Sequence, residues 1–329
     1  MKASATATDV APQADRPKDS TTSLVSVVMP ACNAEKYLRE ALDSVLAQTH
    51  SNLELIVIDD ASTDLTADIL NSYADLRLKI ITNPSRKGAG LSRDIGIAAS
   101  CGQWIAFIDA DDAWLPTRLE KFLAVTSDRH DNVVFDNVME CSTSNNGKLT
   151  PRNMLRSSTE FHPIDQAAAT ITAVQLIDSE RMLLQPLFSR QTLMDTLARH
   201  SNHRFGEDTY FLLKLLSRGA DLIYVRQPLY LYRVSSLSAS SAADKYLLLI
   251  EILKECLMDF RDHPAVLQAL NRKITRTTDD HHRFSLSRAI KDGRFSTAIR
   301  IVLSRPMTLI QLASHNRKKL LKRLSRAYR

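Results

Sequence analysis

The chain has 329 residues, of which 44% are hydrophobic and 24% are charged, and its formal net charge is +6 at pH 7. This length suits one large domain or a domain with a tail, and the hydrophobic share is ample for a buried core. There is no run of about 18 apolar residues, so no segment is expected to span a bilayer. The four cysteines lie far apart and form no zinc-binding or disulfide pattern, which predicts a reduced, cytosolic environment.

The two ends of the chain differ from its middle. Residues 1–23 are rich in Ala, Ser, Thr, Pro, Asp and Lys and lack an apolar stretch, which favours a disordered leader over a secretory signal. Residues 283–329 contain thirteen lysines or arginines and one acid, Asp292, so this end carries +12 and the remainder carries −6. A mildly acidic body with a strongly basic end predicts two parts with different tasks.

Strand-like apolar runs and helical patterns alternate through about residue 127. The expected strands are 24–29, closed by Pro30, then 53–58, 78–81 and the run that begins at Trp104; the expected helices follow Asn33 as N-cap, cover 65–73, and follow a glycine-containing turn at 87–96. This alternation predicts an α/β fold, Rossmann-like, with a mostly parallel sheet flanked by helices.

The second half of the chain is less regular. Residues 130–185 contain an expected edge strand at 132–138 and little else that can be assigned. Helical patterns at 190–199 and 207–218 flank a turn, a strand is expected at 222–225, and the chain from Lys245 onward is helical in pattern.

Two clusters of carboxylates follow expected strands. Asp59 and Asp60 come directly after the second strand, and Asp109, Asp111 and Asp112 end the run from Trp104. Ligands of parallel α/β sheets bind outside the carboxyl ends of the strands, so both clusters are expected at one binding edge. Like charges this close favour a bound cation, and Mg²⁺, Mn²⁺ and Ca²⁺ prefer carboxylate ligands. Helix capping by aspartates is the alternative, and it explains one cluster more easily than two.

The motifs resemble those of the inverting nucleotide-sugar glycosyltransferases of family 2, which have the GT-A fold. The resemblance covers about residues 24–238 and leaves 239–329 as a helical extension with a basic end. Its segments occur in the family's order, namely SVVMPACNAEKYL, ELIVIDDASTD, GLSRDIG, FIDADD, FGED and LYR. It implies transfer of a sugar, with inversion, from a nucleotide diphosphate sugar to a hydroxyl group of a glycan acceptor. UDP is the nucleotide that the family favours.

The resemblance also implies roles for the acids after the Trp104 run. Asp111 would bind a divalent metal, Mg²⁺ or Mn²⁺, directly. Asp109 would contact the ribose, or the metal through water, and Asp112 would support both. The metal would act as a Lewis acid on the leaving diphosphate, which gains negative charge when the bond to the sugar breaks.

Nucleotide contacts follow from the same resemblance. Asp59 or Asp60 would accept a hydrogen bond from the base or the ribose, near the backbone of Pro30 and Ala31. Arg93 would lie beside the nucleotide, where a guanidinium suits the geometry of phosphate.

Asp208, in the Glu207-Asp208 pair, would be the general base that takes the proton of the acceptor hydroxyl. An acidic first helical turn that complements the helix dipole is the structural alternative. Two departures from the family pattern occur. Cys32 stands where the family often has tyrosine, which changes stacking on the base without destroying the site. The residues after Arg233 lack a histidine that many relatives have, so no histidine contribution to metal or phosphate binding is expected.

Residues 307–328 have the pattern of a basic amphipathic helix. Such a helix can lie on an anionic membrane surface, and packing onto the catalytic body is the alternative. Nucleic acid is not expected as a partner, because no reader motif accompanies the charge. The whole chain looks most like bacterial exopolysaccharide glycosyltransferases of the succinoglycan type. This resemblance implies a polyprenyl-diphosphate-linked oligosaccharide acceptor and a cytoplasmic, peripheral location on the inner face of the cell membrane.

Two rival hypotheses stay open at this point. One is a non-catalytic nucleotide-sugar sensor or scaffold at the membrane surface, which would be favoured if Asp208 faced away from the donor. The other is a sugar nucleotidyltransferase, which is also α/β and metal-dependent. The second is disfavoured, because the glycine- and arginine-rich triphosphate loop of that class is not found near the first strand.

Overall fold

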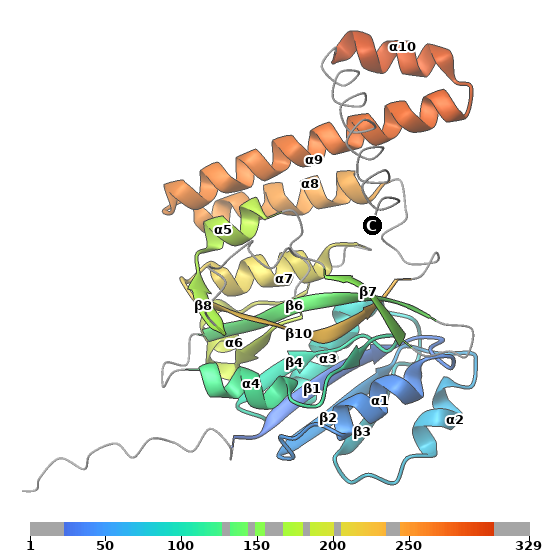
Figure 1. Ribbon diagram of the computed structural model, residues 1–329, viewed down its shortest axis with the longest axis vertical. Coiled ribbons are helices and arrows are strands. Elements are labelled where there is room, and N and C mark those ends of the chain that lie inside the picture. Colours follow the sequence, from blue (N-terminus) through green and yellow to red (C-terminus); the bar gives the residue numbers. More distant parts are fainter. Residues whose placement is uncertain are drawn as a thin grey trace, which may run out of the picture.

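The computed structural model describes residues 23–126, 132–143, 149–154, 167–179, 185–200, 205–234 and 244–305. Within these ranges a ten-stranded sheet forms the centre of the molecule, and helices lie on both of its faces (Figure 1). The strands are β1 (Val25–Ala31), β2 (Leu53–Asp59), β3 (Leu78–Thr82), β4 (Trp104–Phe107), β5 (Ala113–Trp114), β6 (Asn132–Thr143), β7 (Leu149–Met154), β8 (Ala168–Ile171), β9 (Leu187–Ser189) and β10 (Asp221–Arg233). The helices are α1 (Leu38–Leu46), α2 (Thr66–Asn71), α3 (Ala89–Ala99), α4 (Arg118–Val125), α5 (Ala173–Asp178), α6 (Arg190–Thr196), α7 (Glu207–Leu216), α8 (Lys245–Glu255), the 3-10 helix η3 (Cys256–Phe260), α9 (Pro264–Lys291) and α10 (Phe295–Ser304).

The strands of the first half of the chain form the parallel part of the sheet, in the order β3-β2-β1-β4. Strands β1 and β2 are buried along their whole length, which explains their nearly continuous apolar sequence. Beyond β4 the order continues β9-β6-β10-β5; β9 is antiparallel to both neighbours, and β6 is parallel to β10. The predicted α/β fold with a mostly parallel sheet between helices is confirmed.

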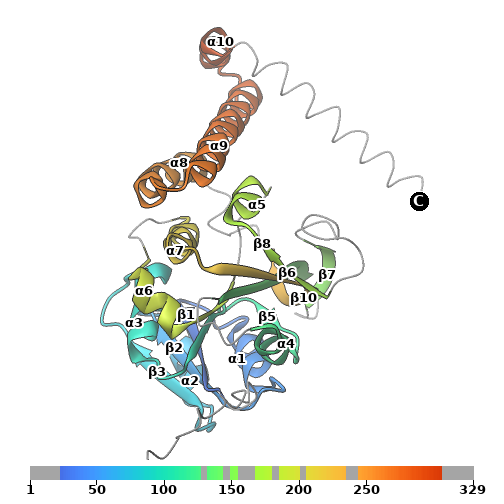
Figure 2. The same cartoon turned by 90° about the vertical axis from the view of Figure 1, so that its left-hand side faces the viewer.

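Alternating side chains of the sheet build two apolar cores. Val27 of β1 belongs to a core with α1, α2 and α4, whereas its neighbour Val28 belongs to a core with α3, α6 and α7. Figure 2 shows these two helical layers on opposite sides of the sheet. Helix α3 lies so close that a Cβ at Gly96 would be 2.3 Å from Cγ1 of Val28, so this position requires glycine.

Two predictions about strands are wrong. The first strand continues through Pro30 to Ala31, because β1 pairs with β4 only as far as Val28, so the missing N–H of Pro30 interrupts no ladder on that side. The strand expected at 132–138 is not at an edge, because β6 lies between β10 and β9. Strand β9 has only three residues, too few for a sequence period to reveal it.

The prediction of Asn33 as a helix N-cap is also wrong. Asn33 has a left-handed backbone with φ of 51°, and its side-chain oxygen accepts a hydrogen bond from the N–H of Thr63 at 2.8 Å. Helix α1 begins later, at Leu38. Asn33 therefore joins the turn after β1 to the turn after β2.

The carboxyl ends of the parallel strands meet at one edge of the sheet. Ala31 at the end of β1 is in register with Asp59 at the end of β2. Val28 of β1 is in register with Phe107, the last residue of β4, and Asp109 follows two residues later. The two acid clusters therefore lie at the same edge.

Beyond β10 the described chain is helical, as predicted. Figure 1 shows α8 and the long α9 above α7, with α10 farthest from the sheet. In the ranges that the structure describes, no helix combines the length and the apolar character needed to cross a bilayer. Residues 1–22 of the expected leader, the boundary at 238 and the basic pattern at 307–328 lie outside the described residues, so these stay predictions.

Candidate active site

Pro30, Ala31 and Asp59 lie together where β1 and β2 end. All three are buried. The Asp59 carboxylate accepts a hydrogen bond from the backbone N–H of Ser62 at 3.1 Å, which closes the turn after β2. The predicted nucleotide contacts of these two strands thus share one preformed corner of the edge.

Asp60 fixes the loop that leads into α3. Its carboxylate accepts hydrogen bonds from the backbone N–H groups of Lys87, at 2.8 Å, and Gly88, at 2.7 Å, and from the side-chain amide of Asn83, at 2.8 Å. Burial favours the neutral carboxyl, but these donors outweigh it and hold the pKa of Asp60 below its ordinary value. Asp60 therefore anchors the glycine-containing turn that the sequence places before the Arg93 helix.

Arg93 joins two acids that are far apart in the sequence. Its Nη2 lies 2.6 Å from Oδ1 of Asp109, and its Nη1 lies 3.2 Å from Oε1 of Glu207. The other oxygen of Asp109 accepts a hydrogen bond of 3.3 Å from the Gln185 side chain. Burial alone would lower the pKa of Arg93, but the charges of Asp109, Glu207 and Asp208 outweigh it and raise that pKa. One guanidinium thus connects the turn after β4 to the start of α7.

Asp112 turns inward and holds the acid turn against β10. Its carboxylate accepts hydrogen bonds of 2.7 Å from the Tyr230 hydroxyl and from the backbone N–H of Arg233. The guanidinium of Arg233 donates to the carbonyl oxygen of Asp111, also at 2.7 Å. Burial, with the nearby charges of Asp111 and Asp109, raises the pKa of Asp112 well above its ordinary value. Both oxygens of Asp112 are therefore used inside the protein.

Arg233 is the hub of the contacts behind the acid turn. Its guanidinium forms an ion pair with Glu40 of α1, donates to the hydroxyl of Thr143 at 2.8 Å, and lies 3.9 Å from the centre of the Tyr37 ring. The side chain is fully buried. Arg233 therefore ties α1, β6 and β10 to the turn that carries Asp111.

Asp111 and Asp208 both have a raised pKa. Asp111 is exposed, yet the protein around its carboxyl group and the charge of Asp109 raise its pKa to about 6. Burial and the charge of Glu207 raise the pKa of Asp208 to about 6, although Arg93 opposes this. At neutral pH Asp208 is thus mostly ionised but basic enough to accept a proton, which suits a general base.

The carboxylates of the acid turn after β4 fit a metal ion that is held partly by the protein and partly by the phosphates of a substrate. In the ranges that the structure describes, no three His, Cys, Asp or Glu side chains form a metal-binding group. Asp112 is buried and used internally, so Asp111 is the exposed carboxylate, and Asp109 beside it is partly exposed although it contacts Arg93 and Gln185. Mg²⁺ is commonly bound by one or two carboxylates together with substrate phosphates rather than by a cage of protein ligands alone. Asp111 and Asp109 match that arrangement.

Three side chains of the site carry contacts that sequence reasoning did not find. Arg233 lies in the LYR motif, so its position was recognised but its contacts were not. Tyr230, within β10, and Gln185, just before β9, had no signal, because each is a single polar residue whose partners are distant in sequence. The ion pair between Arg93 and Glu207 was also missed, since it joins residues 114 positions apart.

We expect replacement of Tyr230 by phenylalanine to destabilise the protein by about 1–3 kcal/mol, because the buried Asp112 carboxylate would lose a donor. The ring would keep its place beside the Arg118 guanidinium, 5.2 Å away, so packing is conserved. Urea unfolding at pH 7 measures the difference. Tyr246→Phe, on α8, is the matched control and should change stability little; equal stability of the Tyr230 variant and wild type would contradict the expectation.

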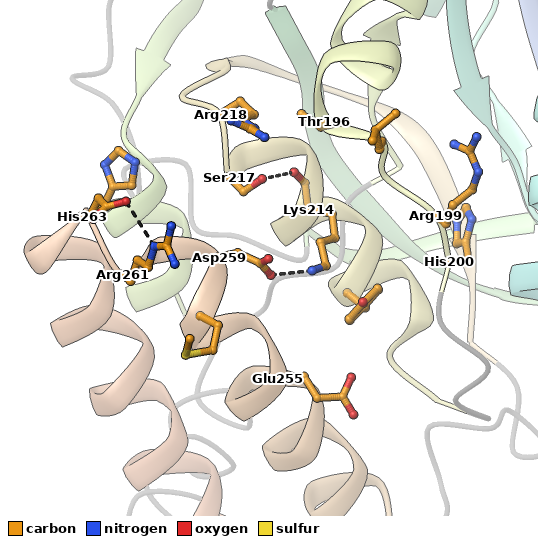
Figure 3. Close-up of a pocket in the computed structure, with 14 residues that line it drawn as sticks. Thr196, Arg199, His200, Lys214, Ser217, Arg218, Glu255, Asp259, Arg261 and His263 are labelled. Carbon is orange, nitrogen blue, oxygen red and sulfur yellow. Dashed lines mark hydrogen bonds and ion pairs between the residues drawn. The ribbon is translucent and has the colours of Figure 1, made fainter.

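A separate cavity of about 910 Å³ lies between α6, α7 and η3 (Figure 3). Its wall includes Arg199, Arg218 and the Lys214–Asp259 ion pair of 2.6 Å. His200 also lines it and stacks on Phe211, with ring centres 4.2 Å apart. None of the site residues predicted from the sequence lines this cavity. The candidate active site is therefore the acidic edge of the sheet.

The α/β sheet with carboxylates after β2 and β4, and with an acidic first turn of α7 beside them, has the architecture of the GT-A class of glycosyltransferases. The family model described as Glycosyl transferase family 2 matches residues 26–190. The chain therefore belongs to glycosyl transferase family 2 and is a glycosyltransferase.

Relatives in sequence agree with this assignment. An uncharacterized glycosyltransferase of Haemophilus influenzae is 30% identical over 220 residues, which cover 66% of this chain and 82% of the relative. The Escherichia coli UDP-Glc:alpha-D-GlcNAc-diphosphoundecaprenol beta-1,3-glucosyltransferase WfgD is 42% identical over 97 residues, covering 30% of this chain and 38% of WfgD. The second similarity thus spans well under half of either protein.

Solved structures share the fold. TarS of Staphylococcus aureus (residues 1–349), in complex with UDP, has a TM-score of 0.61 and 20% identity, with 80% of this chain and 73% of TarS covered. The mannosyltransferase PcManGT from Pyrobaculum calidifontis, in complex with GDP-Man and Mn²⁺, has a TM-score of 0.55 and 18% identity, with 88% and 83% covered. These likenesses confirm the GT-A-like fold.

Proposed function

We propose that the protein transfers a sugar, with inversion, from a nucleotide diphosphate sugar, which we assign as a UDP-sugar, to a hydroxyl of a lipid-linked glycan. The observation that carries the proposal is the double ion pair of Arg93, which holds Asp109 of the donor edge and Glu207 of the acceptor-side helix in one site. Asp208, next to Glu207, is therefore within electrostatic reach of Asp109. The acids to which we assign donor binding and acceptor activation thus lie in one site.

In the donor part of the site, we assign the nucleotide to the corner made by Pro30, Ala31 and Asp59, with Asp60 holding the adjoining loop. Asp111, with Asp109, would hold Mg²⁺ or Mn²⁺ together with the diphosphate. When bound, the metal supplies Lewis-acid stabilisation of the leaving diphosphate.

Chain residues divide the remaining work of the reaction. Arg93 holds the Asp109 carboxylate in orientation through its 2.6 Å contact. Asp112, held by Tyr230 and Arg233, keeps the backbone of the acid turn in place. Asp208 takes the proton of the acceptor hydroxyl as the acceptor oxygen bonds to the anomeric carbon. The bond from that carbon to the phosphate oxygen breaks, and the electron pair leaves with the nucleoside diphosphate.

For the acceptor we propose a polyprenyl-diphosphate-linked sugar, as in succinoglycan-like exopolysaccharide synthesis. The support is the similarity to WfgD, whose name specifies a GlcNAc-diphosphoundecaprenol acceptor. Such an acceptor lies in a bilayer, so we place the enzyme at the inner, cytoplasmic face of the membrane. The anionic surface there would attract the basic C-terminal end.

The test uses the purified full-length protein with a panel of nucleotide sugars, Mg²⁺ or Mn²⁺, and GlcNAc-diphosphate-lipid in detergent micelles. Release of nucleoside diphosphate together with a lengthened acceptor supports the proposal. A parallel assay supplies a nucleoside triphosphate and a sugar 1-phosphate; release of pyrophosphate from that pair would indicate a nucleotidyltransferase. Binding of a nucleotide sugar without any release, with each metal and each acceptor tried, would indicate a sensor or scaffold.

A further inference from the structure

Helix α10 has an uncovered apolar stripe at the end of the helical part. Phe295, Ile299 and Leu303 are four residues apart, so they lie on one side of the helix, and their exposed fractions are 66%, 59% and 77%. Ile290, at the end of α9, is also exposed. Isolated exposed apolar residues are common in proteins, but four large ones within fourteen positions form a patch that needs an explanation.

The stripe is separate from the face that holds α10 in place. Ala298, Ile301 and Val302 pack against Leu286 and Ala289 of α9 in a small apolar cluster of their own. Helix α10 therefore does not need the stripe for its fold. Figures 1 and 2 both show α10 at the far end of the α9 arm, away from the sheet.

The charges around the stripe are nearly all positive. Residues 288–305 contain five basic residues and one acid, Asp292. Arg294 and Arg288 pair with Asp292, at 2.7 and 3.8 Å, and Arg305 lies 3.7 Å from Asp279 of α9. No ion pair to Arg300 is found among the described residues. A helix with a large apolar side and basic flanks fits the boundary between lipid headgroups and acyl chains, where apolar burial and attraction to anionic lipid act together.

We propose that α10 is a membrane-docking element, with the Phe295–Ile299–Leu303 stripe inserted into an anionic bilayer surface. This inference rests on the proposed lipid-linked acceptor, because only such an acceptor requires the enzyme at a bilayer. It differs from the hypothesis for 307–328, since it assigns docking to a helix with its own packed face on α9. Anionic lipid is favoured over a protein partner because Arg294 and Arg305 cap the two ends of α10 and Arg300 lies within it, whereas protein interfaces are depleted of charge at their centres.

The test is co-sedimentation of the full-length protein with vesicles of phosphatidylcholine alone or with one quarter phosphatidylglycerol added. Wild type should bind the anionic vesicles. The Phe295→Ser, Ile299→Ser, Leu303→Ser variant should bind them at least about tenfold more weakly. The three side chains are mostly exposed, and circular dichroism checks that α10 remains folded. Leu76→Ser combined with Met194→Ser is the control, because these exposed apolar residues, at 99% and 61%, lie outside the helical arm.

Two further arms keep the outcomes distinct. If the serine variant binds anionic vesicles as wild type does, or if only deletion of 306–329 removes binding, α10 docking is refuted. If wild type binds no vesicles but dimerises through the stripe, the face is an interface between copies and the proposal is overturned. Transfer to a short-chain acceptor in solution should be unchanged in the serine variant, so loss of docking is separable from failure of the proposed transferase function.

Discussion

Replacing Asp208 by asparagine is expected to lower the rate of sugar transfer about 10²–10⁴-fold, the usual effect of losing a general base. Asparagine has almost the same size and keeps a side-chain oxygen for the N–H of Thr209, which Asp208 accepts at 2.7 Å. It cannot take a proton. Donor binding should survive, because Arg93 and Asp109 keep their contact. The measurement pairs turnover with equilibrium binding of the nucleotide sugar.

The pH dependence gives this prediction a second readout. The pKa of Asp208 is raised to about 6, so the wild-type rate should rise as pH passes through about 6 and level off above it. The same raised pKa means that the ionised carboxylate opposes folding: its contribution to stability is largest below the ordinary pKa and is lost as pH rises through about 6. The asparagine variant should therefore be at least as stable as wild type at pH 8, although it is inactive.

Asp195→Asn, on the exposed side of α6, is the matched control and should leave both rate and stability near wild type. Normal turnover by the Asp208 variant would remove Asp208 from the mechanism. A variant that is inactive because it is unfolded would show lost donor binding and a lower midpoint of unfolding, which separates a structural role from a chemical one.

The sequence predicted the parallel strands and the acidic edge because both depend on local pattern. β1 and β2 are long, buried apolar runs, and the rule that ligands bind at carboxyl ends then places Asp59 and Asp109 at one edge without further information. The prediction that Asn33 caps a helix was wrong because the contact that decides its role is not local. Asn33 has helix-cap chemistry, but Thr63, thirty residues away, competes for its side chain, and no local rule includes Thr63.

The contacts that orient the acids could not be predicted because they are non-local and lack a period. In sequence, Asp112 is a member of the acid cluster that predicts a bound cation, since it follows Asp111 directly. In the structure its carboxylate turns to Tyr230 and Arg233, about 120 residues away, and only the fold of β10 brings these donors to it. A local cluster of like charges thus shows where a site lies, but distant partners decide which member faces the ligand.

Arg93 is expected to be the residue whose loss costs most in stability and activity together. Its guanidinium is buried and contacts Asp109 at 2.6 Å and Glu207 at 3.2 Å, so Arg93→Met would leave two partly buried carboxylates facing each other without a cation. Breaking a buried ion pair from one side typically costs about 3–5 kcal/mol. We expect a loss of this size in urea unfolding and a large rise in the donor KM, because Asp109 would no longer be held in orientation.

A second substitution separates the two effects. Arg93→Met combined with Glu207→Gln removes one of the unpaired carboxylates, so part of the lost stability should return. Donor affinity should not return, since Asp109 still lacks its cation. Arg190→Met is the control for destabilisation alone, because Arg190 donates to the carbonyl oxygens of Gly102 and Ser100, away from the acids. It should lower stability without raising the donor KM.

Other outcomes would refute the view that the contacts of Arg93 with Asp109 and Glu207 organise the site. If the double variant recovered donor affinity along with stability, the damage in Arg93→Met would come from Glu207 repulsion alone, and Asp109 would need no cation from α3. Recovery of neither property would mean that the guanidinium acts chiefly by filling space beside Phe107, which lies 5.9 Å from it. If stability returns in the double variant but donor affinity does not, the proposed role of Arg93 is supported. In that case its guanidinium holds Asp109 at the donor edge and Glu207 of the acceptor-side helix through two separate contacts.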